Sequence, residues 1–174
     1  FLILTFCFLI EDTSNKLVSQ YVGEGLPIFY RISAVWGSRV GPILMWASIM
    51  GIITLIMSRQ KNISNYTIQI MHSWITILFL VSLFLDPFSA SNPGSRRGEI
   101  SPLLQTDLMV IHPPVVFLYY SLCLATATIA VSGVIRSESP EKIHSSMIEW
   151  ARYSLLAGSV GIGLGGLWAY TVLD

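Results

Sequence analysis

The residue in this sequence best placed to bind a metal is His112, which is followed directly by Pro113 and Pro114 and then by an uncharged run. A proline fits the first turn of a helix, because its missing N–H is not needed there, and it holds the preceding residue in an extended conformation. The two prolines therefore predict a helix that begins after His112, with the imidazole fixed at its mouth. An imidazole held in this way can bind iron axially, as haem proteins require. The alternative is a helix-start residue with no ligand role.

No second group of reactive side chains accompanies His112 in the sequence. His72 lies near the start of an apolar run, as interfacial residues do, and His144 lies in a charged stretch where solvated histidines are common. Cys7 and Cys123 stand in separate apolar runs outside any CxxC pattern, which is typical of buried thiols. There is no Gly-rich phosphate loop, no Ser/His/Asp set and no cluster of carboxylates. The sequence therefore does not indicate a self-sufficient hydrolase or transferase.

Composition indicates a membrane protein. Of the 174 residues, 53% are hydrophobic and 11% are charged, and the mean hydropathy is +0.65. Globular domains carry roughly 25% charged residues. Ten basic residues balance ten acidic ones, and no basic stripe is present, so nucleic acid is not expected as a partner.

Four uncharged runs are long enough to cross a membrane, and they lie at residues 41–58, 66–85, 113–135 and 153–173. A span needs ~20 residues, at about 1.5 Å rise per residue, to cross ~30 Å of hydrocarbon. The apolar residues 1–10 predict the end of a fifth span, and hence a chain that begins inside a helix. Such runs suit helices better than barrel strands, because lipid requires every backbone polar group to be satisfied internally. We therefore predict an all-α integral membrane protein, with residues 1–174 forming a single transmembrane domain of about four helices plus the end of a fifth.

The connections between these runs differ in charge. Residues 59–65 and 136–152 read as short basic loops, whereas residues 11–40 and 86–112 are long segments with sparser basic residues. The positive-inside rule places the short loops in the cytoplasm or its equivalent. The two long segments are then expected to share the outer compartment.

Two further patterns concern packing. The aromatic and apolar stretch at residues 26–37 could lie along the membrane surface as an amphipathic element. Gly161 and Gly165 form a GxxxG pair, which allows another helix to approach closely. The pair predicts tight packing of the last span against a neighbour.

Several motifs occur in a particular order along the chain. They are Leu26-Pro-Ile-Phe-Tyr-Arg31, Trp36-Gly37, Trp46, Asp86-Pro-Phe88, Ser101-Pro-Leu-Leu-Gln105, Ile111-His-Pro-Pro114 with Tyr119 and Tyr120, Gly163-Leu-Gly165 and Trp168-Ala-Tyr170. In this order they resemble the N-terminal portion of the CcmF and NrfE family, the membrane haem lyase components of cytochrome c maturation. The resemblance covers nearly the whole chain.

The resemblance implies a role in cytochrome c-type biogenesis, in which haem is presented for covalent attachment to the two thiols of a CxxCH motif in apocytochrome c. It implies that His112 is an axial ligand of the haem iron. The implied partners are haem, a haem chaperone, apocytochrome c and other membrane subunits of the maturation system. The implied location is a bacterial or archaeal plasma membrane, or the mitochondrial inner membrane.

Some family features are not matched. Members carry a tryptophan-rich segment, a second outer histidine and transmembrane histidines, none of which can be assigned up to Asp174. Arg39 and Val40 stand where the family commonly has His-Glu after the Trp-Gly pair. We therefore expect a fragment of a larger assembly protein that does not act as a lyase by itself.

Further haem contacts are expected from residues of the outer segments. Arg31, Arg96 and Arg97 suit haem propionates, because a guanidinium donates charge-assisted hydrogen bonds to carboxylates. Trp36 and Tyr119 could give flat apolar contact to a porphyrin. The alternatives are solvated charges for the arginines and ordinary interfacial aromatics for the other two.

Two other function classes stay open. A subunit of a transporter or channel would require broken helices in paired positions or polar groups along a path. The predicted spans hold no acidic residue and no lysine or arginine, which argues against such a subunit. A structural scaffold of a membrane complex requires no chemistry at all, and it would show no histidine-dependent haem absorption.

Overall fold

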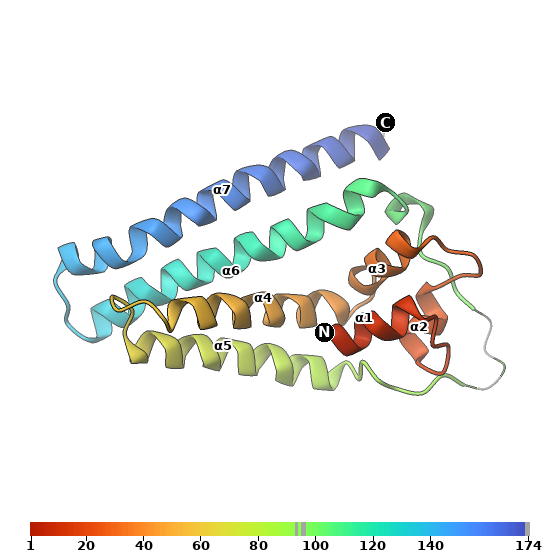
Figure 1. Cartoon of the computed structure of the whole chain (residues 1–174), viewed down its shortest axis with the longest axis horizontal. Helices are drawn as coiled ribbons and strands as arrows, with labels where there is room; N and C mark the ends of the chain where they lie inside the picture. The colour runs from red at the N-terminus through yellow and green to blue at the C-terminus, as the bar shows by residue number, and fades with distance from the viewer. Residues whose placement is uncertain (93, 95–96, 173–174) are drawn as a thin grey trace.

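The structure is a computed structural model that describes residues 1–92, 94 and 97–172. Over these residues the chain forms seven α-helices and one short 3₁₀ helix, and it contains no β-strand. Four long helices run side by side, as Figure 1 shows: α4 (Gly41–Met57), α5 (Asn65–Phe84), α6 (Asp107–Ile135) and α7 (Pro140–Val172). In this bundle α6 packs between α7 and α4, and α4 also packs against α5.

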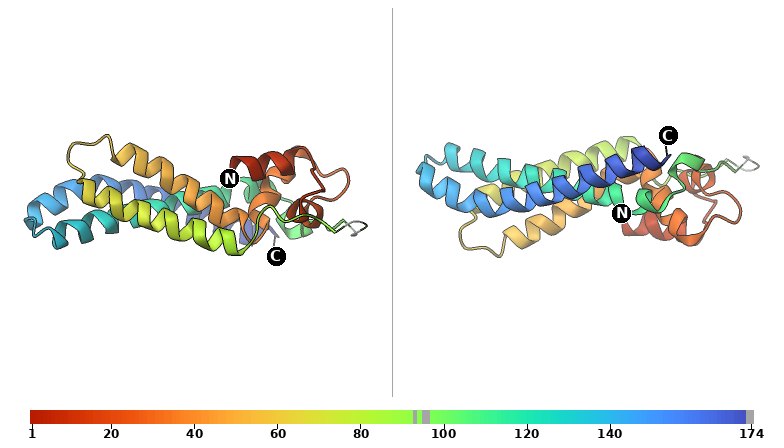
Figure 2. Two further views of the ribbon diagram at one scale, coloured as in Figure 1. Left: turned by 90° about the horizontal axis from the view of Figure 1, so that it is seen from below. Right: turned by 90° about the horizontal axis from the view of Figure 1, so that it is seen from above.

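Three short helices cover one end of the bundle. They are α1 (Leu2–Leu9), α2 (Lys16–Tyr21) and α3 (Ile28–Gly37), and the 3₁₀ helix at Pro102–Leu104 lies at the same end (Figure 2). We call this the α1–α3 end, and we call the opposite end, which holds the connections at residues 58–64 and 136–139, the short-loop end. Leu4 and Phe8 of α1 and Val35 of α3 are fully buried there. The helix α1, the two long segments of the sequence and the start of α4 thus share one apolar core.

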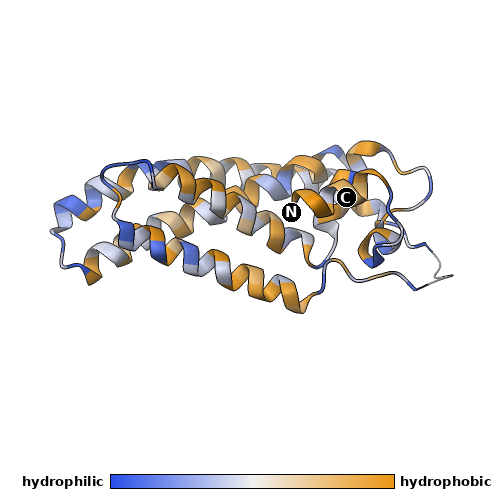
Figure 3. Ribbon diagram, turned by 60° about the horizontal axis from the view of Figure 1, so that its bottom comes forward, coloured by the Kyte–Doolittle hydropathy of each residue, from blue (hydrophilic) through white to orange (hydrophobic). Residues whose placement is uncertain are grey.

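The long helices have the length and hydropathy of membrane spans. Each of α5, α6 and α7 is long and apolar enough to cross a bilayer, and α3 with α4 makes a fourth candidate that is bent by 93°. Figure 3 shows apolar residues along the long helices and hydrophilic ones towards the short-loop end. These findings confirm an all-α membrane protein with three to four candidate spans in the described part of the chain. The compartment that each end faces stays a prediction.

The start of α6 corrects the prediction from the two prolines. The helix begins at Asp107, so Pro113 and Pro114 lie inside it rather than at its first turn. Thr106 caps the helix, because its hydroxyl oxygen accepts a hydrogen bond from the N–H of Met109. Asp107 adds a negative charge near the positive end of the helix dipole. A polar start signal six residues earlier therefore takes precedence over the prolines.

The predicted basic loop at residues 136–152 is also wrong in its bounds. The connection is confined to residues 136–139, and α7 begins at Pro140. His144 is therefore an exposed helical residue in the early part of α7.

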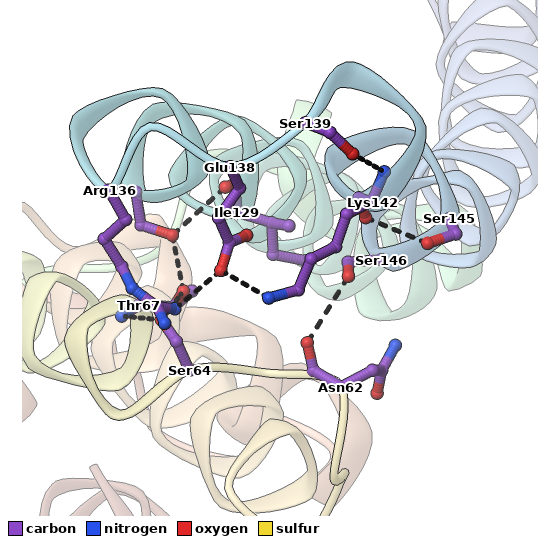
Figure 4. A network of polar contacts seen from close by, with 11 residues as sticks. Asn62, Ser64, Thr67, Ile129, Arg136, Glu138, Ser139, Lys142, Ser145 and Ser146 are labelled. Atoms are coloured by element: carbon purple, nitrogen blue, oxygen red, sulfur yellow. Dashed lines mark hydrogen bonds and ion pairs between the residues drawn. The ribbon is translucent and has the colours of Figure 1, made fainter.

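A polar network joins the helices at the short-loop end, as Figure 4 shows. The hydroxyl oxygens of Thr67 on α5 and Ser132 on α6 lie 2.5 Å apart and are buried. Glu138 accepts a hydrogen bond from Lys142 at 2.9 Å and pairs with Arg136 at 3.0 Å. The hydrogen bond from Lys142, followed by the charge of Arg136, holds the pKa of Glu138 below its ordinary value. The network thus ties α6 to α5 and holds the turn between α6 and α7 together.

Small residues on α7 bring it close to α6. A Cβ atom added at Gly158 would lie 2.8 Å from Cε2 of Tyr119, and one at Gly161 would contact Val116. Gly165 lies against the imidazole of His112. The predicted close packing around Gly161 and Gly165 is confirmed, and the neighbour is α6. This packing fixes the surroundings of the candidate site.

Candidate functional site

The candidate site is the helix pair at the α1–α3 end where His112 of α6 meets Gly165 of α7. His112 lies in the second turn of α6 and is half-buried. A Cβ atom at position 165 would lie 2.8 Å from Cε1 and 3.4 Å from Nε2 of the imidazole. The ring is therefore pressed against the α7 backbone, and any side chain larger than hydrogen at position 165 would displace it.

Two polar atoms of this helix pair are buried without a hydrogen-bond partner among the described residues: Nδ1 of His112 and Nε1 of Trp168. Trp168 follows Gly165 by three residues, so both lie on the same face of α7. His72 provides a contrast, because its Nδ1 lies 2.8 Å from the carbonyl oxygen of Ile68. An unpaired buried polar group costs about 1–3 kcal/mol, and native proteins keep such groups rarely. Trp46 of α4 has a third such nitrogen, so these atoms by themselves do not locate a ligand, and Nδ1 of His112 shows only which edge of the imidazole is buried.

Trp36 supports the turn that precedes His112. Within a helix the N–H of residue 113 would donate to the carbonyl of Met109, but Pro113 has no N–H. The indole N–H of Trp36 donates to this carbonyl instead, at 2.7 Å, and Trp36 is only 9% exposed. The carbonyl that the proline leaves free is thus satisfied from α3. Trp36, which the sequence suggested as a porphyrin contact, has its polar atom engaged with the α6 backbone.

Arg31 and Arg97, two of the arginines expected to bind haem, pair with Glu11 instead. Arg31 lies 2.7 Å from Glu11, and Arg97 lies 3.7 Å from the same carboxylate. Arg31 also donates hydrogen bonds to two backbone carbonyls. No hydrogen bond or ion pair links either arginine to His112, and Arg96 lies outside the described residues. Their predicted role as propionate partners stays a prediction.

Tyr119 shares a face of α6 with His112, because the two residues are seven positions apart, or about two helical turns. Its ring is packed against Gly158 of α7, and its centroid lies 5.5 Å from that of Tyr120. The interface between α6 and α7 therefore brings Tyr119 and His112 onto one side of the same helix pair. Contact of Tyr119 with a ligand stays a prediction.

The donor set suits a single axial bond to haem iron. The described residues contain no group of three or more His, Cys, Asp or Glu side chains that could hold a metal ion alone. A haem iron is already held by its porphyrin and needs one or two axial ligands, for which a neutral imidazole is suited. Because Nδ1 is the buried nitrogen, Nε2 is the nitrogen left to reach a ligand. His112 thus fits one axial position of haem.

The sequence did not predict that the carbonyl of Met109 accepts a bond from Trp36, or that Gly165 contacts His112. The carbonyl of Met109 could have been found, because any proline inside a helix leaves the carbonyl four residues earlier without its usual donor. The proximity of Gly165 to His112 could not, because it depends on the register between α6 and α7.

Comparisons with known proteins agree with this arrangement. The family described as "Cytochrome C assembly protein" matches residues 36–174. A probable cytochrome c-type biogenesis protein NrfE from Escherichia coli is 30% identical over 98% of this chain and 32% of its own length. A cytochrome c-type biogenesis protein CcmF from Pseudomonas aeruginosa is 32% identical over 96% of this chain and 27% of its own.

A third relative, the cytochrome c-type biogenesis protein CycK from Rhizobium meliloti, is 28% identical over 98% of this chain and 26% of its own length. The chain thus spans about a third or less of each of these relatives. No solved structure matches it. Because the family match covers most of the chain, including the helix pair that holds His112 and Gly165, this protein belongs to the cytochrome c assembly protein family.

Proposed function

We propose that this chain acts in cytochrome c maturation by binding haem through His112 and presenting it for attachment to apocytochrome c. The observation that carries the proposal is the half-buried imidazole of His112, which lies against Gly165 and has a buried Nδ1, so that Nε2 is the nitrogen that can bind iron. The names of the relatives support the biological process. The motif Ile111-His-Pro-Pro114 and its family resemblance support the ligand role.

The residues around His112 would hold the bound haem in one orientation. Nε2 of His112 would bind the iron, while Gly165 limits rotation of the ring from one side. Trp36 holds the turn before His112 through the carbonyl of Met109. A ligand held by a restrained side chain keeps a fixed orientation, which lowers the entropic cost of a later reaction. Haem itself would supply the vinyl groups to which the two cytochrome thiols add.

The length of α6 supports a position of His112 at the membrane surface. Its 29 residues extend about 44 Å, which is longer than a hydrocarbon core of ~30 Å. Arg136 directly follows the helix and marks a polar boundary at the short-loop end. Counting ~20 residues back from Ile135 reaches Val116, so His112 lies about one turn beyond the hydrocarbon. A haem held there would be accessible to a water-soluble cytochrome.

We assign presentation of haem, and not lyase chemistry, to this chain. Lyase activity, a haem chaperone, apocytochrome c and other membrane subunits belong to the proposal for the larger assembly in which the chain would act. Arg31 and Arg97 would serve the propionates only if their pairs with Glu11 rearranged, and Arg96 is proposed for the same role from its place in the sequence.

The test is the absorption spectrum of the detergent-purified protein with added haem, recorded beside His112→Ala and His72→Ala. We expect a Soret band characteristic of histidine ligation that is lost in His112→Ala. His72→Ala is the matched control, because His72 is an exposed histidine on another long helix and its loss should leave the band unchanged. Identical spectra of all three proteins would refute His112 as the ligand. Circular dichroism of each variant shows whether the helices are retained.

A further inference from the structure

We propose that a cavity at the α1–α3 end binds the headgroup of a phospholipid, with phosphatidylethanolamine as the preferred ligand. The cavity has a volume of about 700 Å³ and lies between α2, the link from α3 to α4, and the end of α5. This volume falls in the range of roughly 300–1,000 Å³ that is usual for small-molecule sites. The site is separate from His112, and the proposal does not depend on haem binding.

The charged and amide side chains around this cavity have no side-chain partner among the described residues, whereas the hydroxyl of Ser89 donates to the carbonyl of Asp86. Among the described residues, none of the following makes a side-chain hydrogen bond or ion pair: Lys16, Gln20, Tyr21, Arg39 and Asp86. At the same end of the bundle, Arg31 and Arg97 are both paired with Glu11. The fold therefore neutralises one set of cations internally and leaves Lys16 and Arg39 free around a hollow. Free cations beside a cavity favour an anionic group as the ligand.

The position of the cavity favours a lipid over a soluble anion. Phe84 is the last residue of α5, a candidate membrane span, and its side chain both lines the cavity and is 89% exposed. Leu83 beside it is 72% exposed. Large apolar side chains at the end of a span lie where acyl chains meet headgroups. A ligand in this cavity would therefore have an apolar tail beside Phe84 and a charged head between α2 and Arg39.

The charges of the lining select the type of headgroup. Lys16 and Arg39 can bind a phosphodiester, which carries one negative charge, through charge-assisted hydrogen bonds. Asp86 lines the same cavity and can accept hydrogen bonds from a primary ammonium. Phosphatidylethanolamine offers both groups. Phosphatidylglycerol lacks the cation, and the quaternary amine of phosphatidylcholine has no N–H to donate.

The test is native mass spectrometry of the full chain in detergent, titrated separately with phosphatidylethanolamine, phosphatidylglycerol and phosphatidylcholine. Each basic residue near a charged membrane surface contributes roughly a factor of five in affinity. We therefore expect the double variant Lys16→Gln/Arg39→Gln to bind phosphatidylethanolamine about 25-fold more weakly. Arg59→Gln/Lys61→Gln is the matched control, because it removes the same two charge types from the short-loop end. The control should bind as the unchanged protein does.

A second variant tests the choice of headgroup. Asp86→Asn should remove the preference for phosphatidylethanolamine over phosphatidylglycerol while phosphatidylglycerol still binds. Equal losses in the double variant and in its control would overturn the proposal, because binding would then follow overall charge. Binding of inorganic phosphate without any lipid preference would overturn it as well, since the cavity would then be a simple anion site. Thermal melting of each variant checks that the fold is retained.

Discussion

The hydrogen bond between Trp36 and the carbonyl of Met109 can be tested by giving the carbonyl a different donor. Trp36→Phe removes the indole N–H and keeps an aromatic ring in the apolar core of the α1–α3 end. Loss of this bond leaves a half-buried carbonyl unpaired, which costs about 1–3 kcal/mol. We expect the lower part of this range, because the environment of the bond is only partly buried. The free energy of unfolding should therefore fall by about 1–2 kcal/mol, in addition to any loss of packing.

The second half of the test uses Pro113→Ala. Alanine at this position supplies an N–H that can donate to Met109 in the ordinary helical pattern. In this background the carbonyl keeps a partner when Trp36 is replaced, so Trp36→Phe should cost less. We expect a coupling free energy of about 1 kcal/mol between the two positions. Stability would be measured by reversible unfolding in mixed detergents, as differences between paired variants.

A matched control comes from the other end of the bundle. Trp150 donates its indole N–H to the side-chain oxygen of Gln60 at 3.2 Å, and no proline is involved. Trp150→Phe should lower stability by a similar amount, but its cost should not change in the Pro113→Ala background. Additivity of Trp36→Phe and Pro113→Ala within about 0.5 kcal/mol would refute the reasoning.

Two further predictions concern the glycine contact and the short-loop end. Gly165→Ala should weaken haem binding and shift the Soret band in a haem titration, because its Cβ would lie 2.8 Å from Cε1 of His112; Gly163→Ala, which would meet no atom within 4 Å, should change neither. An unchanged haem titration of Gly165→Ala would contradict the contact. The lowered pKa of Glu138 contributes stability above its ordinary value of 4.5, and this contribution is lost as the pH falls through the folded-state pKa. Glu138→Gln should therefore flatten the acid side of a plot of melting temperature against pH, whereas a steep acid side in this variant would assign the effect to another group.

The long helices were predictable from the sequence because lipid leaves few choices to the chain. A run of ~20 uncharged residues must satisfy its backbone internally, and a helix does so without a partner. The four predicted spans accordingly correspond to α4, α5, α6 and α7. The ends of these helices were less predictable, because a helix can continue past the hydrocarbon. The first turns of α7 carry Lys142 and Glu149, which hydropathy reads as a loop, although Trp150 beside them is buried.

The predicted start of α6 was wrong because the preference of proline for the first turn of a helix does not take contacts with other helices into account. A proline inside a helix removes a hydrogen bond and crowds the carbonyl four residues earlier, and Trp36 supplies the missing donor to that carbonyl from 73 residues away in the sequence. The ion pair of Arg31 with Glu11 could not be predicted from the sequence either, because it depends on the packing of α1 against α3. His112 could be predicted as a candidate ligand from the sequence, because Pro113 and Pro114 directly follow it. Its contact with Gly165 needed the structure.

The two prolines in α6 also have a mechanical consequence. The helix lacks two consecutive backbone donors, at Pro113 and Pro114, so its first turns are joined to the long apolar part by fewer hydrogen bonds than an ordinary helix provides. Of the two carbonyls affected, that of Met109 is bonded to α3. A displacement of α3 is therefore passed to the first turns of α6 through the bond from Trp36, through the hydrogen bond from Tyr30 to Asp107 and through apolar packing around Met109. His112 lies at the part of α6 that has the fewest backbone hydrogen bonds. A movement of the short helices would therefore reorient the imidazole more easily than it would bend the rest of α6.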